Sequence, residues 1–261
     1  MKLRIGALSE LYAQPLYRTL KGSPDNPGEL LFDTPAAHIE GLMSKELDAA
    51  FAAPMDYALN SSDLIVFPNV GVAGSGLDST MRLYFRGKLR SISSMAVGKV
   101  STTDVVLSRT VLAEKYDSTP AIVPVAGSID DMLAKADCAL VTGDVLHTLH
   151  SQHPFIDVVD EWSDIAELPF VHAICVTREE SFRKEINELL SASQQAGRIE
   201  LEAIAKELAH ERNLPFDSVY QFLSHFSYGF DERGRESLDA FFQMAFFHGL
   251  MGDVPEIKIG E

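Results

Sequence analysis

The fold is indicated by two similar segments, SKELDAAFAAPMD at residues 44–56 and LAKADCALVTGD at residues 133–144. Each segment runs from a helix end through an aspartate into a short apolar strand and a turn. Strand-like runs, beginning with LRIGAL at residues 3–8, alternate with helical stretches along the chain. The alternation predicts an α/β fold with mainly parallel strands, and the repeated segment predicts two similar halves.

The two halves also predict where a ligand binds. In open α/β sheets, ligands bind where strands end and helices begin, because helix N-termini present unpaired N–H groups there. We therefore expect two lobes with a ligand-binding cleft between them. A basic, serine-rich segment at residues 86–104 predicts a crossing between the lobes. The first lobe is expected to comprise residues 1–88 and 174–261, and the second lobe residues 89–173.

Composition narrows the class of partner. The chain has 261 residues, of which 46% are apolar, and it carries 38 acidic against 22 basic side chains. This negative charge repels nucleic-acid phosphates and anionic lipids, so neither nucleic acid nor a membrane is an expected partner. A small-molecule ligand and a monomer or homodimer are expected instead.

The chain is expected to be cytoplasmic. Ser9 and Glu10 interrupt the N-terminal segment before an apolar run of useful length, and no later window approaches the roughly 18 apolar residues of a membrane span. The two cysteines, Cys138 and Cys175, lie in apolar strand-like runs, where a buried free thiol is the usual state.

Hydroxyl side chains at a helix start form the strongest local signal. In VGKVSTTDVVLSRTVLAEKY, residues 97–116, a strand end is followed by Ser101, Thr102 and Thr103, and then by a helix with Asp104 in its first turn. Hydroxyls and free N–H groups at such a start can bind a carboxylate without a basic side chain. Simple N-capping explains the same residues equally well, and both interpretations stay open here.

A second polar segment follows three glycines. In PNVGVAGSGLDSTMRLYFRG, residues 68–87, the glycines precede Asp78, Ser79 and Thr80. Glycine allows close approach of the backbone to a ligand, and the hydroxyls can bond to it. The alternative is a flexible turn before the strand MRLYF.

The histidines do not predict a metal site. His147, His150 and His153 recur at intervals of three, but Pro154 and the polar residues around them indicate a fraying helix end. His172, in PFVHAICV, is expected to be a core or cleft-wall histidine rather than a general base. Neither a metal nor a cofactor is expected.

Taken together, these segments resemble the family of chorismate dehydratases and their relatives in the futalosine route to menaquinone. ELYAQPL, residues 10–16, is similar to the family's Tyr-Leu-Asn-x-x-Pro-Leu run. The order of further segments agrees with the family along nearly the whole chain. These are TPAAHIEGLMSKELDAAFA (34–52), MDYAL (55–59), VSTTD (100–104), ADCALVTGD (136–144) and EWSDIAELPFVHAICVTREE (161–180).

The resemblance implies a two-lobed fold of the type II periplasmic-binding-protein class, with the ligand in the cleft between the lobes. In the dehydratases the ligand is chorismate, which loses water to give 3-(1-carboxyvinyloxy)benzoate. The family's cleft serine corresponds to Thr80, which keeps a hydroxyl and is therefore the candidate catalytic residue. The Gly-Asp turn corresponds to Gly143 and Asp144, which join Tyr12 and the three hydroxyl residues of the helix start as candidate ligand-binding residues.

The sequence departs from the family pattern at the cleft lip. The family's catalytic asparagine corresponds to Tyr12, and a Ser-Ser pair is replaced by Ala53 and Pro54. A phenol is larger than an amide and donates only once. The first hypothesis is therefore a chorismate-dehydratase-like protein, a carbon–oxygen lyase if it is an enzyme. The alternative is a non-catalytic protein that binds a small carboxylate, and formation of 1,4-dihydroxy-6-naphthoate ranks last.

Overall fold

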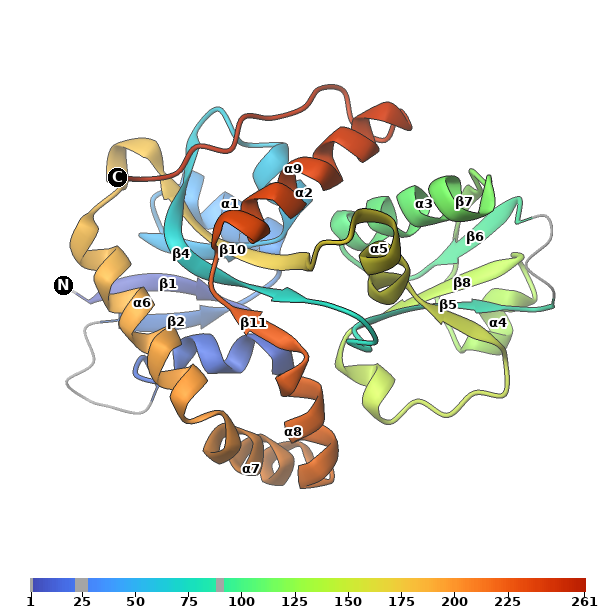
Figure 1. Ribbon diagram of the computed structural model, residues 1–261, viewed down its shortest axis with the longest axis horizontal. Helices are drawn as coiled ribbons and strands as arrows, with labels where there is room; N and C mark the ends of the chain where they lie inside the picture. Colours follow the sequence, from blue (N-terminus) through green and yellow to red (C-terminus); the bar gives the residue numbers. More distant parts are fainter. Residues whose placement is uncertain (1, 22–27, 88–91) are drawn as a thin grey trace. The chain divides into compact units, whose positions relative to one another are not determined.

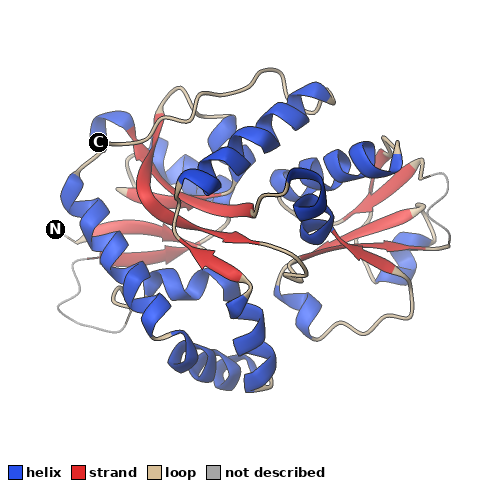
Figure 2. Ribbon diagram, in the orientation of Figure 1, coloured by secondary structure: helices blue, strands red, loops and turns tan. Residues whose placement is uncertain are grey.

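A computed structural model describes residues 2–21, 28–87 and 92–261. Contacts divide these residues into two compact units. The first unit comprises the described residues up to Gly74 together with Val171–Asp239 and Pro255–Glu261. The second comprises the described residues of Ser75–Phe170 together with Ala240–Val254. The α/β class expected from the sequence is confirmed, because each unit is built on its own sheet with flanking helices (Figure 2).

The sheet of the first unit has the order β11-β4-β10-β3-β1-β2. Its strands are β1 (Leu3–Ala7), β2 (Gly28–Phe32), β3 (Ala49–Ala52), β4 (Leu64–Gly74), β10 (Phe170–Arg178) and β11 (Phe226–Tyr228). Strands β1, β2 and β3 are parallel, whereas β10 and β11 run antiparallel to β3 and β4. The sheet is therefore mixed, because the chain returns to this unit from the opposite direction after leaving it through β4.

Helices cover the first sheet, and their buried faces complete its core. They are η1 (Leu11–Tyr17), α1 (Pro35–Met43), α2 (Pro54–Ala58), η3 (Glu179–Ser181), α6 (Lys184–Ile199), α7 (Leu201–Arg212), α8 (Phe216–Ser224) and the first part of α9 (Glu232–Phe247). Buried side chains of β1, η1, α6, α7 and α8 form one continuous apolar cluster. Helix α1 begins as its sequence predicts, with the Thr34 side chain accepting a bond from the Ala37 N–H and Pro35 in the first turn.

The sheet of the second unit has the order β7-β6-β8-β5-β9. Its strands are β5 (Met81–Phe85), β6 (Ser94–Val97), β7 (Ala121–Pro124), β8 (Cys138–Thr142) and β9 (Phe155–Asp157), and its helices are α3 (Thr102–Tyr116), α4 (Ile129–Leu133), η2 (Asp144–His147), α5 (Val158–Ala166) and the last part of α9. Figure 1 shows α3 and α4 beside this sheet. Strands β6, β7 and β8 are parallel, and β5 is antiparallel to β8 and β9.

The division of the chain differs from the boundaries expected from the sequence. The expected boundary between residues 88 and 89 lies outside the described residues, and the units divide between Gly74 and Ser75. The reason is that β5, which precedes residue 88, pairs with β8 and β9 in the second sheet. The return crossing lies at 170/171 rather than 173/174. Residues 240–254 of the C-terminal segment belong to the second unit, where Phe241 packs edge-on against Trp162 and Phe170.

Candidate functional site

Several of the predicted site residues lie at one edge of the second sheet. Strands β6 and β8 are parallel, so their carboxyl ends meet at this edge, and Ser101 follows β6 whereas Gly143 follows β8. Strand β5 runs the other way, with Met81 opposite Thr142. Thr80, directly before β5, therefore lies at the same edge. Strand pairing alone places Thr80, Gly143 and the helix start at Ser101 on the ligand-binding side typical of α/β sheets.

Thr80 is held by short-range contacts. Its backbone N–H and its side-chain hydroxyl both donate to Oδ1 of Asp78, at 3.0 and 2.7 Å. Its carbonyl accepts from the Gly143 N–H at 2.9 Å, which joins two of the predicted site residues directly. The side chains are nearly enclosed, because Thr80 is 6% exposed and Asp78 is fully buried. Thr80 therefore presents a hydroxyl of fixed orientation.

A second buried carboxylate lies beside this turn. Asp157, at the end of β9, is 4% exposed and accepts the N–H of Ser79 at 3.0 Å through Oδ2. Its Oδ1 accepts the N–H groups of Val159 and Asp160 at 3.1 and 3.2 Å, and so caps α5. Burial and the nearby charge of Asp78 raise the pKa of Asp157 to about 7. The sequence analysis missed Asp157, whose only local signal is an aspartate before a helix.

The helix start of α3 is a complete capping box. Oγ of Ser101 accepts the Asp104 N–H at 3.0 Å, and the Asp104 carboxylate accepts the Ser101 N–H at 3.3 Å. Thr102 is exposed, whereas Thr103 is buried. Ser101 therefore caps the N-terminus of α3, which is one of the two interpretations that the sequence left open. The carboxylate subsite at Ser101, Thr102 and Thr103 stays a prediction.

The turn after β8 brings further polar groups to the edge. Gly143 has a φ of +86°, which favours glycine, and a Cβ at this position would meet open space. Asp144 begins η2, and His147 ends it. Burial lowers the pKa of His147, while the charge of Asp144 opposes this shift and that of Arg82 adds to it. Asp144 and Arg82 are therefore both close enough to His147 for their charges to affect it.

Tyr12 belongs to the first unit and lies in η1, after the carboxyl end of β1. Its half-buried ring stacks on Phe226, with centroids 5.6 Å apart, and lies 5.0 Å from the ring of His172. His172 is buried and also contacts Phe226 edge-on. Both residues are thus part of an aromatic cluster at the edge of the first sheet. A contact of Tyr12 with a ligand stays a prediction.

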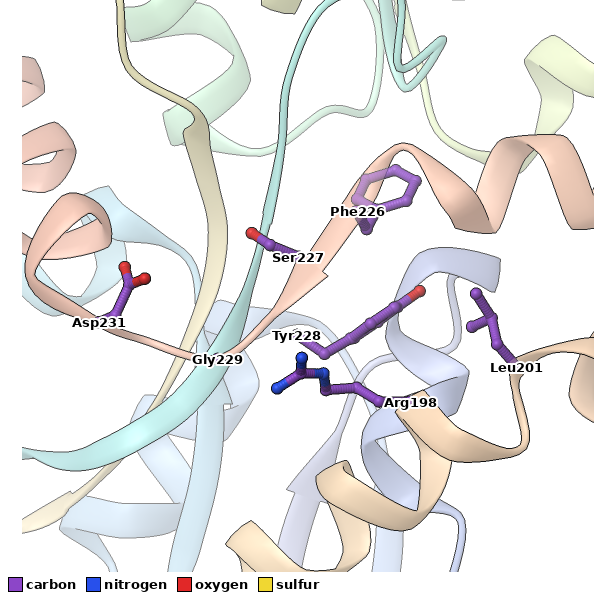
Figure 3. Close-up of a pocket in the computed structure, with 7 residues that line it drawn as sticks. All are labelled: Arg198, Leu201, Phe226, Ser227, Tyr228, Gly229 and Asp231. Atoms are coloured by element: carbon purple, nitrogen blue, oxygen red, sulfur yellow. The ribbon is translucent and has the colours of Figure 1, made fainter.

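A separate pocket of about 290 Å³ adjoins this cluster (Figure 3). It is lined by Arg198, Leu201, Phe226, Ser227, Tyr228, Gly229 and Asp231. The hydroxyl of Tyr228 is buried, with no hydrogen-bond partner among the described residues, and burial raises its pKa. Phe226 lines this pocket and also contacts the ring of Tyr12. The pocket therefore lies next to Tyr12, the candidate site residue of the first unit.

In the part of the chain that the structure describes, the three spaced histidines belong to no cluster of metal-ligating groups. His153 bonds to Asp130 through Nε2 at 2.7 Å. Within residues 2–21, 28–87 and 92–261, no group of three or more His, Cys, Asp or Glu side chains is arranged to hold a metal. Within the same ranges, no helix has both the length and the apolar character needed to cross a bilayer.

The chain matches the model of a protein family described as menaquinone biosynthesis over residues 3–246. The chain belongs to the menaquinone biosynthesis family. It is 24% identical over 229 residues to a chorismate dehydratase from Thermus thermophilus, a match that covers 81% of this chain and 84% of that protein. The family expected from the sequence is therefore confirmed.

Solved structures show the fold of this family member. A protein from Archaeoglobus fulgidus matches with a TM-score of 0.71 at 16% identity, covering 96% of this chain and 98% of that one. The periplasmic aliphatic sulphonate binding protein of Escherichia coli matches with a TM-score of 0.66 at 15% identity, covering 100% and 92%. The chain has the fold of the periplasmic binding proteins, as the sequence predicted.

Proposed function

We propose that this protein binds chorismate, or a closely similar carboxylate, and that the carboxyl edge of the second sheet supplies part of its site. Membership of the menaquinone biosynthesis family, together with the similarity to a chorismate dehydratase, carries the proposal. The binding-protein fold supports a small-molecule ligand. Two free, buried cysteines fit a reducing compartment, and we keep the cytoplasm as the proposed location.

Dehydration is the first candidate reaction. Chorismate would lose a ring proton and its ring hydroxyl as one water molecule, leaving an aromatic ring without a change of net redox state. The reaction needs a group that contacts the hydroxyl or the proton and a site that holds the carboxylates. Thr80 is proposed for the first role. The helix start at Ser101, Thr102 and Thr103 and the turn at Gly143 and Asp144 are proposed for the second.

Binding without chemistry is the second candidate, and Tyr12 favours it. Tyr12 stands where the dehydratases are expected to have an asparagine, and its ring is committed to the contacts with His172 and Phe226. Catalysis requires contacts that are stronger in the transition state than in the ground state. A phenol in place of an amide can therefore preserve binding while it lowers the rate.

Two measurements on the purified protein test the proposal. Calorimetric titration with chorismate should show saturable binding, and a protein that binds no chorismate would contradict the proposed function. Chromatography of the incubated mixture then separates the two candidates through formation of 3-(1-carboxyvinyloxy)benzoate. We expect slow or absent turnover, and turnover on the order of 1 to 10 per second would establish an ordinary enzyme.

Replacement of Tyr12 tests its role directly. Tyr12→Asn should not restore rapid turnover, because Ala53 and Pro54 also differ from the dehydratase pattern. The variant also loses two ring contacts, so we expect it to cost roughly 1 to 3 kcal/mol of unfolding free energy. The matched control is Tyr220→Asn, which removes a more exposed ring on α8. Rapid turnover in Tyr12→Asn alone would show that this one residue limits the reaction.

A further inference from the structure

The hydroxyl of Thr80 has a fixed direction. A hydroxyl carries one proton and two lone pairs, and the Thr80 proton points to Oδ1 of Asp78 at 2.7 Å. The Thr80 backbone N–H donates to the same oxygen at 3.0 Å, which holds the turn closed. With its proton engaged, the hydroxyl has only lone pairs to offer to another group.

A second buried carboxyl group, that of Asp157, lies beside Asp78. Both carboxyl groups are buried, and they are joined through the turn, since Ser79 donates its N–H to Asp157 while Thr80 donates to Asp78. Burial and the charge of Asp78 both disfavour ionisation of Asp157, so Asp157 holds a proton at a pH where an exposed aspartate would have lost it. The raised pKa of Asp157, about 7, agrees with this arrangement.

Other charged groups approach the pair from neighbouring elements. Arg82 of β5 is the strand partner of Asp157, donates to Oγ of Ser79 at 3.3 Å and lies over the Phe155 ring. Burial raises the pKa of Asp160 of α5, and the nearby carboxylates, Asp78 among them, add to this shift. Further charges on or beside these elements include Glu161 and Asp164 of α5, both of which pair with Lys115 of α3. Helix α3 also carries Asp104, Arg109 and Glu114. Asp144 and His147 lie near Arg82.

We propose that Asp78, coupled to Asp157, is a positioning residue that makes the Thr80 hydroxyl a hydrogen-bond acceptor toward the ligand. This inference rests on the proposed function and extends it to specificity. A group that only accepts selects a ligand that can donate. Chorismate has a ring hydroxyl, whereas its dehydration product has none. The site therefore prefers chorismate to the product, and Asp78 is the origin of that preference.

A ligand-free measurement tests the coupling. The methyl resonance of Thr80 is followed by NMR from pH 5 to 9, and in the unmodified protein it should titrate with a midpoint near 7. Asp157→Asn should abolish this titration, and Asp78→Asn should lower its midpoint because the like charge is gone. Asp137→Asn is the matched control. Asp137 accepts the Ser93 hydroxyl at 2.7 Å before β8, at the other edge of the sheet, and its loss should leave the Thr80 titration unchanged.

A binding measurement tests the specificity. Affinities for chorismate and for 3-(1-carboxyvinyloxy)benzoate are measured by calorimetry at pH 8. Thr80→Ser should keep the preference for chorismate, and Thr80→Val should lose it. In Asp78→Asn the preference should fall roughly 2- to 10-fold, the range that corresponds to one ordinary hydrogen bond, because the amide can also donate to Thr80. Equal losses for both ligands would overturn the inference.

The two measurements separate failure of the inference from failure of the proposed function. A flat Thr80 titration in a protein that binds chorismate would overturn the coupling alone. A protein that shows the titration but binds neither compound would contradict the proposed function while the coupling stands. If Asp78→Asn does not fold, Thr80→Ser and Thr80→Val still test the inference: the preference for chorismate should remain in the first variant and be lost in the second. An unchanged preference in both would overturn the inference.

Discussion

At the scale of the residue, the buried Asp157 makes stability depend on pH. Its folded pKa, about 7, lies above the ordinary value of about 3.9 for an unfolded chain, so folding disfavours its charged form. The stability that protonated Asp157 contributes is fully present below about pH 4 and is lost as the pH rises through about 7. Asp157→Asn cannot ionise and should avoid this loss.

Urea unfolding at pH 5 and pH 8 measures the effect. The unfolding free energy of Asp157→Asn, minus that of the unmodified protein, should be larger at pH 8 than at pH 5. This difference does not depend on the stability of the variant at either pH. Asp137→Asn is the control, since bonds from Ser93 and Ser94 lower the pKa of Asp137 to about 2 and its titration is over before pH 5. If Asp157→Asn and Asp137→Asn behave alike, Asp157 is already charged at pH 5.

At the scale of the element, the packing of α6 on η1 depends on one glycine. A Cβ on Gly197 would lie 1.8 Å from the carbonyl oxygen of Pro15, a contact with backbone that cannot rotate away. In an exposed helix, replacing glycine by alanine gains up to about 1 kcal/mol. Gly197→Ala should instead lose about 3 kcal/mol or more of unfolding free energy, because α6 must move away from η1.

Thermal and urea unfolding of Gly197→Ala measure this loss. The control is Gly252→Ala, where an added Cβ would meet no atom within 4 Å. Gly252→Ala should change the unfolding free energy little. Equal stability of both variants would show that α6 can shift without cost.

The start of α3 carries a second prediction at this scale. Thr103→Val should weaken binding of chorismate by roughly 1 to 3 kcal/mol if the helix start is a carboxylate subsite, because an unmet polar group would remain in the complex. Thr110→Val is a matched control in the same helix. Thr110 is buried, and its hydroxyl has no partner among the described residues. Its replacement should leave affinity unchanged, and an unchanged affinity in Thr103→Val would restrict the helix start to its capping role.

At the scale of the whole molecule, a ligand that binds only the folded chain raises its stability by mass action. At 100 times its dissociation constant, chorismate should add about 2.7 kcal/mol to the unfolding free energy. For a chain of this size, that corresponds to a rise of roughly 5 to 10 °C in Tm. A scan of Tm against chorismate concentration measures the rise, and Asp137→Asn should show the same increment from its own starting value. An unchanged Tm at high chorismate would contradict the proposed ligand.

Local patterns in the sequence determined where several strands and helices of this protein lie. The strands at residues 49–52 and 138–142 and the helix start after Ser101 follow from apolar runs and capping residues, which act over a few neighbouring positions. The sequence therefore predicted the α/β class, and through family resemblance the binding-protein fold. Thr80 and Gly143 were also predicted as site residues, although their direct contact depends on the pairing of β5 with β8.

Tertiary structure alone decided which unit each of several segments joins. Strand β5 belongs to the second sheet, and α9 continues into the second unit, because antiparallel pairing and aromatic packing with distant residues hold them there. The same pairing brings Asp157 beside Asp78, a residue 79 positions earlier in the chain. No local pattern encodes such a meeting, because the free energy of a buried carboxylate depends on the neighbours and the loss of water that only the folded chain creates.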